Sequence, residues 1–284
     1  MTRRVVVTGM GGVTSLGNDW PTIRACFAAG KTGIRRMPEW DRYTGVNTRL
    51  AAPVEGFDVE ERYDRKKLRT MGPVSRLAVY ASEQALADAG LIGTRHLAGG
   101  RAGVAYGSSF GSHQAVLGFA QLMLSGASSK LNGTSYVQMM SHTTAVNVGL
   151  FFGITGRIVP TSSACTSGSQ GIGFVNGHGT ATDWGDLEES KATAAVLGHQ
   201  MPIHSLKSYF GHTLGACGSI EAWLGIEMMK EGSFAPTANL ANVDERCAEL
   251  DYVKGAARWL DIEYLMSNNF AFGGINTSLI FKRV

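Results

Sequence analysis

Apolar positions recur along the chain with two different periods, which predict helices and strands in alternation. One helix is expected over residues 72–90, where six apolar side chains share a helical stripe: Val74, Leu77, Ala78, Ala81, Ala85 and Ala89. Further apolar segments predict a helix end at 147–152 and a buried helix at 219–229. Short apolar runs predict strands at 4–8, 102–107, 156–160, 264–267 and 278–281. Strands that alternate with helices predict an α/β fold.

The composition is that of an ordinary globular protein, with 44% hydrophobic and 17% charged residues in a chain of 284. This length is enough for one large domain or two small ones. A net charge of +3 is too small to indicate nucleic acid as a partner. No apolar run reaches the length of a membrane span, and the first residues do not resemble a signal peptide. We therefore predict a cytoplasmic protein that binds neither nucleic acid nor membrane.

The four cysteines show no CxxC spacing, so we expect neither zinc nor a disulfide framework. Cys165 stands out because small residues surround it, in the run Ser163-Ala164-Cys165-Thr166-Ser167-Gly168-Ser169. A helix that begins at this cysteine would favour the thiolate, which is a nucleophile for acyl transfer. Taken alone, such a cysteine is more often a small buried core residue that packs like alanine.

Two histidines lie between glycines, in Asn176-Gly177-His178-Gly179 and in Phe210-Gly211-His212-Thr213. Glycine neighbours leave the ring nitrogens accessible to a ligand, although a lone histidine is more often structural. Two such rings and a thiol suit the formation of a carbon–carbon bond, because ring N–H groups can stabilise a developing enolate oxygen. Lys207 and Glu221 could order the two rings by hydrogen bonds and charge.

Together these motifs resemble the β-ketoacyl-acyl-carrier-protein synthases of the elongating class, which have a Cys-His-His centre. The resemblance begins at residues 5–11 and continues through 235–240 to 269–276, in the order that the family has. It implies a thiolase-like α/β fold of two similar halves stacked in five layers. Residues 1–174 would form the half with the nucleophile, and residues 175–284 the half with both histidines.

The resemblance also implies a role for each catalytic residue and a homodimer. Cys165 would take an acyl chain from acyl carrier protein. His178 and His212 would stabilise the enolate that forms when a malonyl group loses CO2, while Lys207 and Glu221 support their geometry. The product would be a β-ketoacyl chain that is two carbons longer.

Further residues are implied to contact the substrate. Thr180 and Thr182 match threonines that bind the phosphopantetheine arm of acyl carrier protein, and since the substrates arrive on this arm, no separate cofactor is expected. Phe272, with Phe270 beside it, matches a gate next to the nucleophile. Phe110 matches a position in the acyl pocket, where a phenyl ring would favour short or medium chains. Each of these side chains is also compatible with simple packing in the core or in a turn.

The sequence contains one dense group of basic residues, which we call the basic cluster. Its members are Arg62, Arg65, Lys66, Lys67 and Arg69. Such clusters are usually solvated surface. Because the partner of the family is the acidic acyl carrier protein, and the matching segment contributes to docking it, the cluster also predicts a docking site. Lys66 and Arg69 are the two residues that we expect to contribute most.

One feature departs from the family pattern. Cys165 and His178 lie close together in this sequence, whereas well over a hundred residues separate them in the family. A segment is therefore missing near Phe174 and Val175. Either the sequence joins parts of a longer chain, or the protein has a true internal deletion that would leave sheet edges unpaired. The first alternative predicts a break in the chain near Phe174.

Two other function classes are less consistent with the sequence. A catalytically silent partner subunit would lack the nucleophile, and this chain keeps Cys165. A dinucleotide-binding oxidoreductase would need a third glycine after Gly9 and Gly11, and that position is Thr14.

Overall fold

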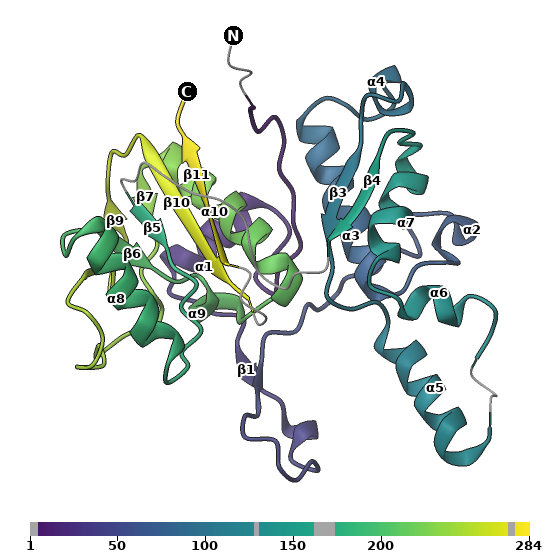
Figure 1. Ribbon diagram of the computed structural model, residues 1–284, viewed down its shortest axis with the longest axis horizontal. Coiled ribbons are helices and arrows are strands. Elements are labelled where there is room, and N and C mark those ends of the chain that lie inside the picture. Colours follow the sequence, from purple (N-terminus) through teal and green to yellow (C-terminus); the bar gives the residue numbers. More distant parts are fainter. Residues whose placement is uncertain (1–4, 128–130, 162–173, 272–275) are drawn as a thin grey trace. The chain divides into compact units, whose positions relative to one another are not determined.

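The computed structural model describes residues 5–127, 131–161, 174–271 and 276–284. Contacts divide the chain into two compact units, and each is described by itself (Figure 1). The first unit comprises residues 1–13 and 56–164, and the second comprises 14–55 and 165–284. This division differs from the halves 1–174 and 175–284 in placing residues 14–55 and 165–174 in the second unit. The two halves inferred from the family resemblance stay a prediction.

The first unit is built around two helices and a pair of parallel strands. Its elements are α2 (Arg65–Leu68), α3 (Pro73–Asp88), α4 (Arg95–Ala98), β3 (Val104–Gly107), α5 (His113–Ser125), α6 (Ser135–Met139), α7 (Thr143–Phe152) and β4 (Ile158–Thr161). Helix α7 packs against α3 and against both strands. Helix α7 approaches β4 closely at Gly149, where a Cβ would lie 2.6 Å from Ile158 Cδ1 and would displace the end of that side chain. The helices expected at 72–90 and 147–152 and the strands expected at 102–107 and 156–160 are confirmed.

The prediction of a strand at residues 4–8 is wrong for residues 5–8, which are the part of this run that the structure describes. Residues 5–8 form no strand, and Val5 is 97% exposed. The sheet of this unit contains β3 and β4 among the described residues, and neither strand pairs with residues 5–8. An apolar run becomes a strand only where a neighbouring strand takes its hydrogen bonds.

The second unit contains a five-stranded sheet in the order β11-β10-β5-β6-β8. Strands β5 (Phe174–Asn176), β6 (Pro202–His204), β8 (Asp251–Tyr252) and β10 (Tyr264–Phe270) run parallel, and β11 (Asn276–Lys282) pairs antiparallel with β10. The remaining strands form two small ribbons: β1 (Arg35–Arg36) with β2 (Leu50–Ala51), and β7 (Ser233–Phe234) with β9 (Arg258–Trp259). The closing strands expected at 264–267 and 278–281 are confirmed as parts of β10 and β11.

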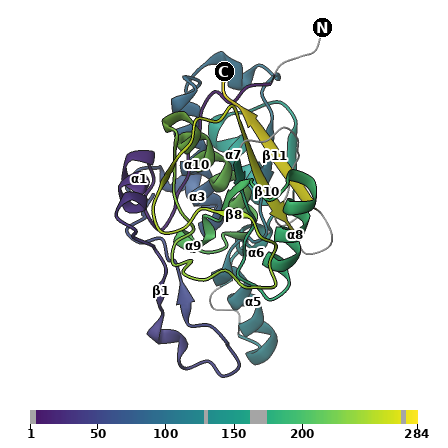
Figure 2. The same ribbon diagram turned by 90° about the vertical axis from the view of Figure 1, so that its left-hand side faces the viewer.

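Helices cover both faces of this sheet (Figures 1 and 2). The described helices of this unit are α1 (Trp20–Ala28), η1 (Pro38–Trp40), α8 (Gly185–Leu197), α9 (Lys207–Phe210), η2 (Leu214–Ala216) and α10 (Cys217–Glu231), and α8 and α10 are the two that cover the sheet. Leu265 of β10 touches α10 at Gly225, whereas the next residue, Met266, lies in the cluster that includes Leu197 of α8. Successive side chains of a strand point to opposite faces, so α10 and α8 lie on opposite sides of the sheet. The buried helix expected at 219–229 is confirmed as part of α10.

Strand β5 is continuous from Phe174 through Val175 to Asn176. Phe174 and Val175 are fully buried, and they pair in register with Leu265 and Met266 of β10. The residues directly before Phe174 lie outside the described part of the chain, so the break expected near Phe174 stays a prediction. Strand β5 positions the loop with the first histidine, because Gly177 and His178 follow it directly.

Candidate active site

A buried carboxylate holds the loop that carries His178. Glu189 of α8 accepts hydrogen bonds from the backbone N–H of His178, at 2.7 Å, and from that of Gly179, at 2.8 Å. Gly179 has a φ of +31°, and a Cβ there would lie 2.6 Å from Cβ of Ser205. The glycine neighbour of His178 is therefore needed for this backbone path as well as for access to the ring.

The same loop continues through a strained turn that contains both predicted threonines. Ala181 has a φ of +55°, a rare conformation for a residue with a side chain. Its N–H donates to both carboxylate oxygens of Asp186, at 3.1 and 3.2 Å. The hydroxyl groups of Thr180 and Thr182 lie 3.0 Å apart in a hydrogen bond. A turn that is both strained and anchored points to a functional role for its shape.

The loop that carries His212 follows α9. Gly211 has a φ of +75°, and its N–H donates to the carbonyl oxygen of Lys207 at 2.8 Å. Leu214 has a φ of +50°, and its N–H donates to His212 Nδ1 at 3.2 Å. Because Nδ1 accepts this hydrogen bond, the proton of the neutral ring resides on Nε2. His212 can therefore offer an Nε2–H donor to a ligand.

The structure brings the two predicted histidines together. Their ring centroids lie 5.1 Å apart with the planes at 90°, and the ring of Phe270 lies 5.7 Å from that of His178. Burial, the charge of Lys207 and the neighbouring His212 lower the pKa of His178 to about 3. Burial and Lys207 also lower the pKa of His212. Both rings are therefore neutral near pH 7 and act as hydrogen-bond donors, not as cations.

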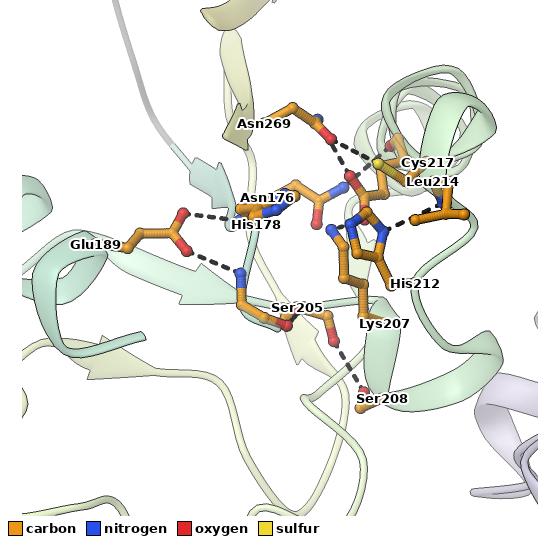
Figure 3. A network of polar contacts seen from close by, with 12 residues as sticks. Asn176, His178, Glu189, Ser205, Lys207, Ser208, His212, Leu214, Cys217 and Asn269 are labelled. Carbon is orange, nitrogen blue, oxygen red and sulfur yellow. Dashed lines mark hydrogen bonds and ion pairs between the residues drawn. The ribbon is translucent and has the colours of Figure 1, made fainter. Parts of the chain in front are cut away.

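Lys207 and Glu221 form an ion pair beside these rings. Nζ of Lys207 lies 2.5 Å from Oε1 of Glu221, and the two side chains are 4% and 0% exposed. Burial raises the pKa of Glu221 to about 7, while the charge of Lys207 opposes this change. Two amides complete the environment: Asn269 Nδ2 donates to Glu221 Oε2 at 3.2 Å, and Asn176 Nδ2 donates to the Glu221 carbonyl at 3.1 Å. Figure 3 shows this polar network around Lys207 and His212.

A cavity of about 1080 Å³ opens at these residues. Thr180, Thr182, Lys207 and His212 line it. Its volume is at the upper end of the range that is typical of small-molecule and cofactor sites. No cluster of His, Cys, Asp and Glu side chains that could hold a metal ion occurs within the described ranges. In the same part of the chain, no helix is both long and apolar enough to cross a bilayer.

The remaining predicted residues are not joined to this site by the structure. Cys165 and Phe272 lie outside the described residues. Lys66 in α2 and Arg69 just after it are exposed in the first unit. Phe110 belongs to the same unit and is 47% exposed, so it is not a core residue of this chain.

The sequence reasoning missed three residues that shape the site: Glu189, Asn269 and Cys217. Glu189 had a usable signal, because Asp186 and Glu189 are three residues apart at the start of α8 and so share one face. Asn269 and Cys217 had none, since their contact joins residues 52 positions apart.

Comparison with known proteins identifies the family. Residues 2–175 match the model of the β-ketoacyl synthase N-terminal domain, and residues 162–241 match that of the C-terminal domain. The chain belongs to the β-ketoacyl synthase family. The predicted family and its thiolase-like α/β fold are thereby confirmed.

Individual relatives agree with this assignment. A β-ketoacyl synthase from Burkholderia phymatum is 41% identical, with a TM-score of 0.94 over 100% of both chains. The 3-oxoacyl-[acyl-carrier-protein] synthase 2 of Vibrio cholerae is 27% identical, and the alignment covers 99% of each chain. A ketosynthase solved in complex with its type II polyketide acyl carrier protein shares the fold, with a TM-score of 0.78 at 17% identity.

The Vibrio cholerae alignment also bears on the missing segment. It extends over 414 residues, whereas this chain has 284, so more than a hundred aligned positions have no counterpart here. The matches to the two domain models meet at residues 162–175. This is the region where the sequence analysis placed the missing segment.

Proposed function

We propose that this protein is a β-ketoacyl-acyl-carrier-protein synthase that catalyses a decarboxylative Claisen condensation. The observation that carries the proposal is the pair of neutral histidines, 5.1 Å apart, beside the buried Lys207–Glu221 pair, with His212 and Lys207 lining a large cavity. The relatives named 3-oxoacyl-[acyl-carrier-protein] synthase 2 support the same activity.

The proposed reaction has two chemical steps after the thiolate of Cys165 has taken an acyl group as a thioester. In the first, the malonyl group loses CO2, and the electrons of the broken carbon–carbon bond form an enolate. Nε2–H of His212 and a ring N–H of His178 donate to the enolate oxygen. In the second, the enolate carbon attacks the thioester carbonyl, and the Cys165 thiolate leaves. The product is a β-ketoacyl thioester two carbons longer.

A fixed geometry of the two N–H donors matters most in this scheme. Donors that are already oriented stabilise the enolate without any reorganisation during the reaction. The Glu189 carboxylate orients the backbone at His178, and the Leu214 N–H orients the ring of His212. The carbon–carbon bond forms without a redox change, so no nicotinamide cofactor takes part in the proposed reaction.

The test is a condensation assay with acyl- and malonyl-carrier protein in the absence of NAD(P)H. The wild type should form the β-ketoacyl product. His212→Ala should lose both condensation and malonyl decarboxylation, because it removes one of the two donors. Product formation by the wild type that requires added NAD(P)H would contradict the proposal and favour an oxidoreductase.

The proposed partner that delivers the substrates is acyl carrier protein, docked at the basic cluster. Lys66 and Arg69 are exposed, which supports their availability to an acidic partner. Arg62 is less available, because it forms an ion pair with Glu83 at 2.6 Å. The complex of a ketosynthase of this fold with its carrier protein supports the same class of partner.

Charge reversal tests this docking site. The double variant Lys66→Glu/Arg69→Glu should raise KM for acyl-carrier protein, with little effect on small thioester mimics. Salt should weaken the wild type more than this variant. The matched control Lys31→Glu/Lys254→Glu changes the net charge equally at exposed positions outside the cluster. Equal KM values for the two double variants would contradict the docking site.

The proposed assembly is a homodimer formed through the first unit. Helix α5 contains no Asp, Glu, Lys or Arg, yet Met123 and Leu124 in it are 86% and 88% exposed. Tyr136 of α6 and Leu150 of α7 add further exposed apolar surface. An exposed apolar surface of this kind indicates a protein partner, and a two-fold dimer covers both copies with one self-complementary patch.

Light scattering after gel filtration tests the assembly. The purified chain alone should have twice its monomer mass, and Leu124→Glu should shift it toward the monomer. A monomeric wild type that dimerises only with a different subunit would contradict the homodimer. The cytoplasmic location stays a prediction from the sequence.

A further inference from the structure

The buried carboxylate of Glu221 has a second hydrogen-bond donor, which the proposed mechanism does not use. Oε1 of Glu221 lies 2.5 Å from Nζ of Lys207, and Oε2 accepts a hydrogen bond from Nδ2 of Asn269 at 3.2 Å. The side chain of Glu221 is 0% exposed and Asn269 is 3% exposed, so bulk solvent does not compete for either contact. A carboxylate in this position depends on such contacts, because burial favours the protonated form.

The thiol of Cys217 favours one orientation of the Asn269 amide. Its Sγ donates to Oδ1 of Asn269 at 2.8 Å (Figure 3). Cys217 lies four residues before Glu221 in α10, so both residues contact the amide from one face of the helix. Because the thiol donates its S–H, the carbonyl oxygen of the amide faces it and the NH2 group faces Glu221. Gly218 leaves room for the amide, since a Cβ there would lie 3.3 Å from Nδ2.

This orientation of the amide stabilises the ionised form of Glu221 in preference to the protonated form. A hydrogen bond to an ionised acceptor is roughly twice as strong as one to a neutral acceptor. In a flipped amide, Oδ1 of Asn269 would face the carboxyl group, and only a protonated Glu221 could donate to it. The orientation of the amide and the charge of Glu221 are therefore coupled.

The groups around Glu221 act on its charge in opposite directions. Burial has the largest effect and raises the pKa of Glu221, and the charge of Glu189 in α8 adds to this rise. The charge of Lys207 in α9 and the hydrogen bonds from Lys207 and Asn269 oppose it, and the resulting pKa is about 7. Near neutral pH, the loss of one of these contacts therefore changes the fraction of Glu221 that is ionised.

We propose that Asn269 is a positioning residue whose amide, held by the thiol of Cys217, stabilises the ionised form of Glu221. The charged carboxylate in turn holds the ammonium of Lys207 beside the two histidines of the site. After burial, the charge of this ammonium is the next largest effect that lowers the pKa of both rings. The effect on the rate rests on the proposed function, but the ionisation of Glu221 does not.

Infrared spectroscopy tests this role, because a protonated carboxyl group has a carbonyl stretch that a carboxylate lacks. The band of Glu221 is followed as a function of pH in the ligand-free, glutamate-labelled protein, and it is assigned by its loss in Glu221→Gln. The wild type should titrate with a midpoint at about pH 7. Asn269→Leu removes the donor and should raise the midpoint by about one to two pH units, the shift expected for loss of one hydrogen bond to a charged group.

Substitutions of Cys217 test the orientation of the amide and leave its NH2 group in place. Cys217→Ala should raise the midpoint by about half a pH unit, because the amide can then flip. Cys217→Ser keeps a donor and should restore the midpoint of the wild type. Cys26→Ala removes a cysteine of α1 outside this network and should leave the midpoint unchanged. An unchanged midpoint in either Asn269→Leu or Cys217→Ala would overturn the inference, and Cys217→Ala provides this test if Asn269→Leu does not fold.

The pH profile of malonyl decarboxylation provides the second readout. In Asn269→Leu, kcat at pH 7 should fall roughly five- to fiftyfold, in proportion to the ionised fraction of Glu221, with little change in KM. The rate should recover toward that of the wild type above the new midpoint. A rate that is reduced equally at every pH would indicate a purely structural role and contradict the inference. A wild type in which Glu221 titrates as expected but malonyl-carrier protein keeps its CO2 would contradict the proposed function, whereas the infrared midpoints decide this inference.

Discussion

Lys207→Met should separate the structural role of the buried ion pair from its electrostatic role at the histidines. The substitution keeps the apolar stem and removes the ammonium that lies 2.5 Å from Glu221 Oε1. Removing one partner of a buried pair costs about 3–5 kcal/mol, because the other charge remains buried alone. Both side chains are almost fully buried, so solvent screens little of this loss.

The cost should depend on pH in a defined direction. The pKa of Glu221 in the folded protein is already about 7, above its usual 4.5, and loss of the opposing Lys207 charge raises it further. A carboxyl with a raised pKa takes up a proton on folding, so its contribution to stability is lost as the pH rises through the folded pKa. Lys207→Met should therefore destabilise the protein less at pH 5 than at pH 8 relative to the wild type. Urea unfolding at both pH values measures this difference.

The same variant should change the acid limb of catalysis. The charge of Lys207 lowers the pKa of both His178 and His212, and its loss moves both values back toward 6.5. Malonyl decarboxylation should then decline at a higher pH than in the wild type. In Lys207→Met/Glu221→Leu, no charge is left unpaired, so stability should recover to within about 1–2 kcal/mol of the wild type while activity stays low. A cost below about 1 kcal/mol for Lys207→Met, together with an unchanged pH profile, would refute this reasoning.

Three further predictions follow from individual side chains. Burial lowers the pKa of His204 to about 4, so the free energy of unfolding should fall by about 3 kcal/mol as the pH drops from 6.5 to 4. Thermal unfolding of His204→Gln should show a weaker dependence of stability on pH than the wild type, and an equal dependence in both proteins would contradict this. Glu189→Gln replaces one of two acceptors by a donor and should cost about 2–3 kcal/mol in urea unfolding and lower the decarboxylation rate; a rate equal to that of the wild type would show that the loop needs no carboxylate. Phe110→Ala should increase acylation by long primers relative to short ones, and an unchanged ratio across a primer series would mean that Phe110 does not limit chain length.

Local periodicity predicted two kinds of element: helices, whose backbone hydrogen bonds are made within the element, and strands in the centre of the second unit. Helix α3 has an apolar stripe, helix α10 is apolar and buried on most of its sides, and the long strands β10 and β11 combine apolar runs with a direct pairing. The apolar run at residues 5–8 has the same composition as a strand, but its state depends on a neighbour that the run itself does not encode. The pattern of a strand is therefore a weaker signal than that of a helix.

The candidate site shows the same difference between residues that a local motif predicts and residues whose role depends on a distant segment. His178, His212, Lys207 and Glu221 were predicted from motifs, and the structure places them together. Asn269 and Cys217 escaped prediction because an amide and a thiol carry no signal until a helix and a strand bring them within 2.8 Å. The backbone positions with positive φ at Ala181 and Leu214 were missed for a related reason: neither residue type indicates such a conformation.

The most direct test of the proposed reaction is a single turnover observed by intact-protein mass spectrometry. The wild type should gain the mass of one acyl group from acyl-carrier protein and lose it when malonyl-carrier protein is added, with release of a β-ketoacyl product two carbons longer. Cys165→Ser should neither gain the acyl group nor form the product, because an unactivated hydroxyl is a far weaker nucleophile than a thiolate. An acyl group that attaches equally to Cys165→Ser, or a product that forms without the acylated protein, would contradict the account.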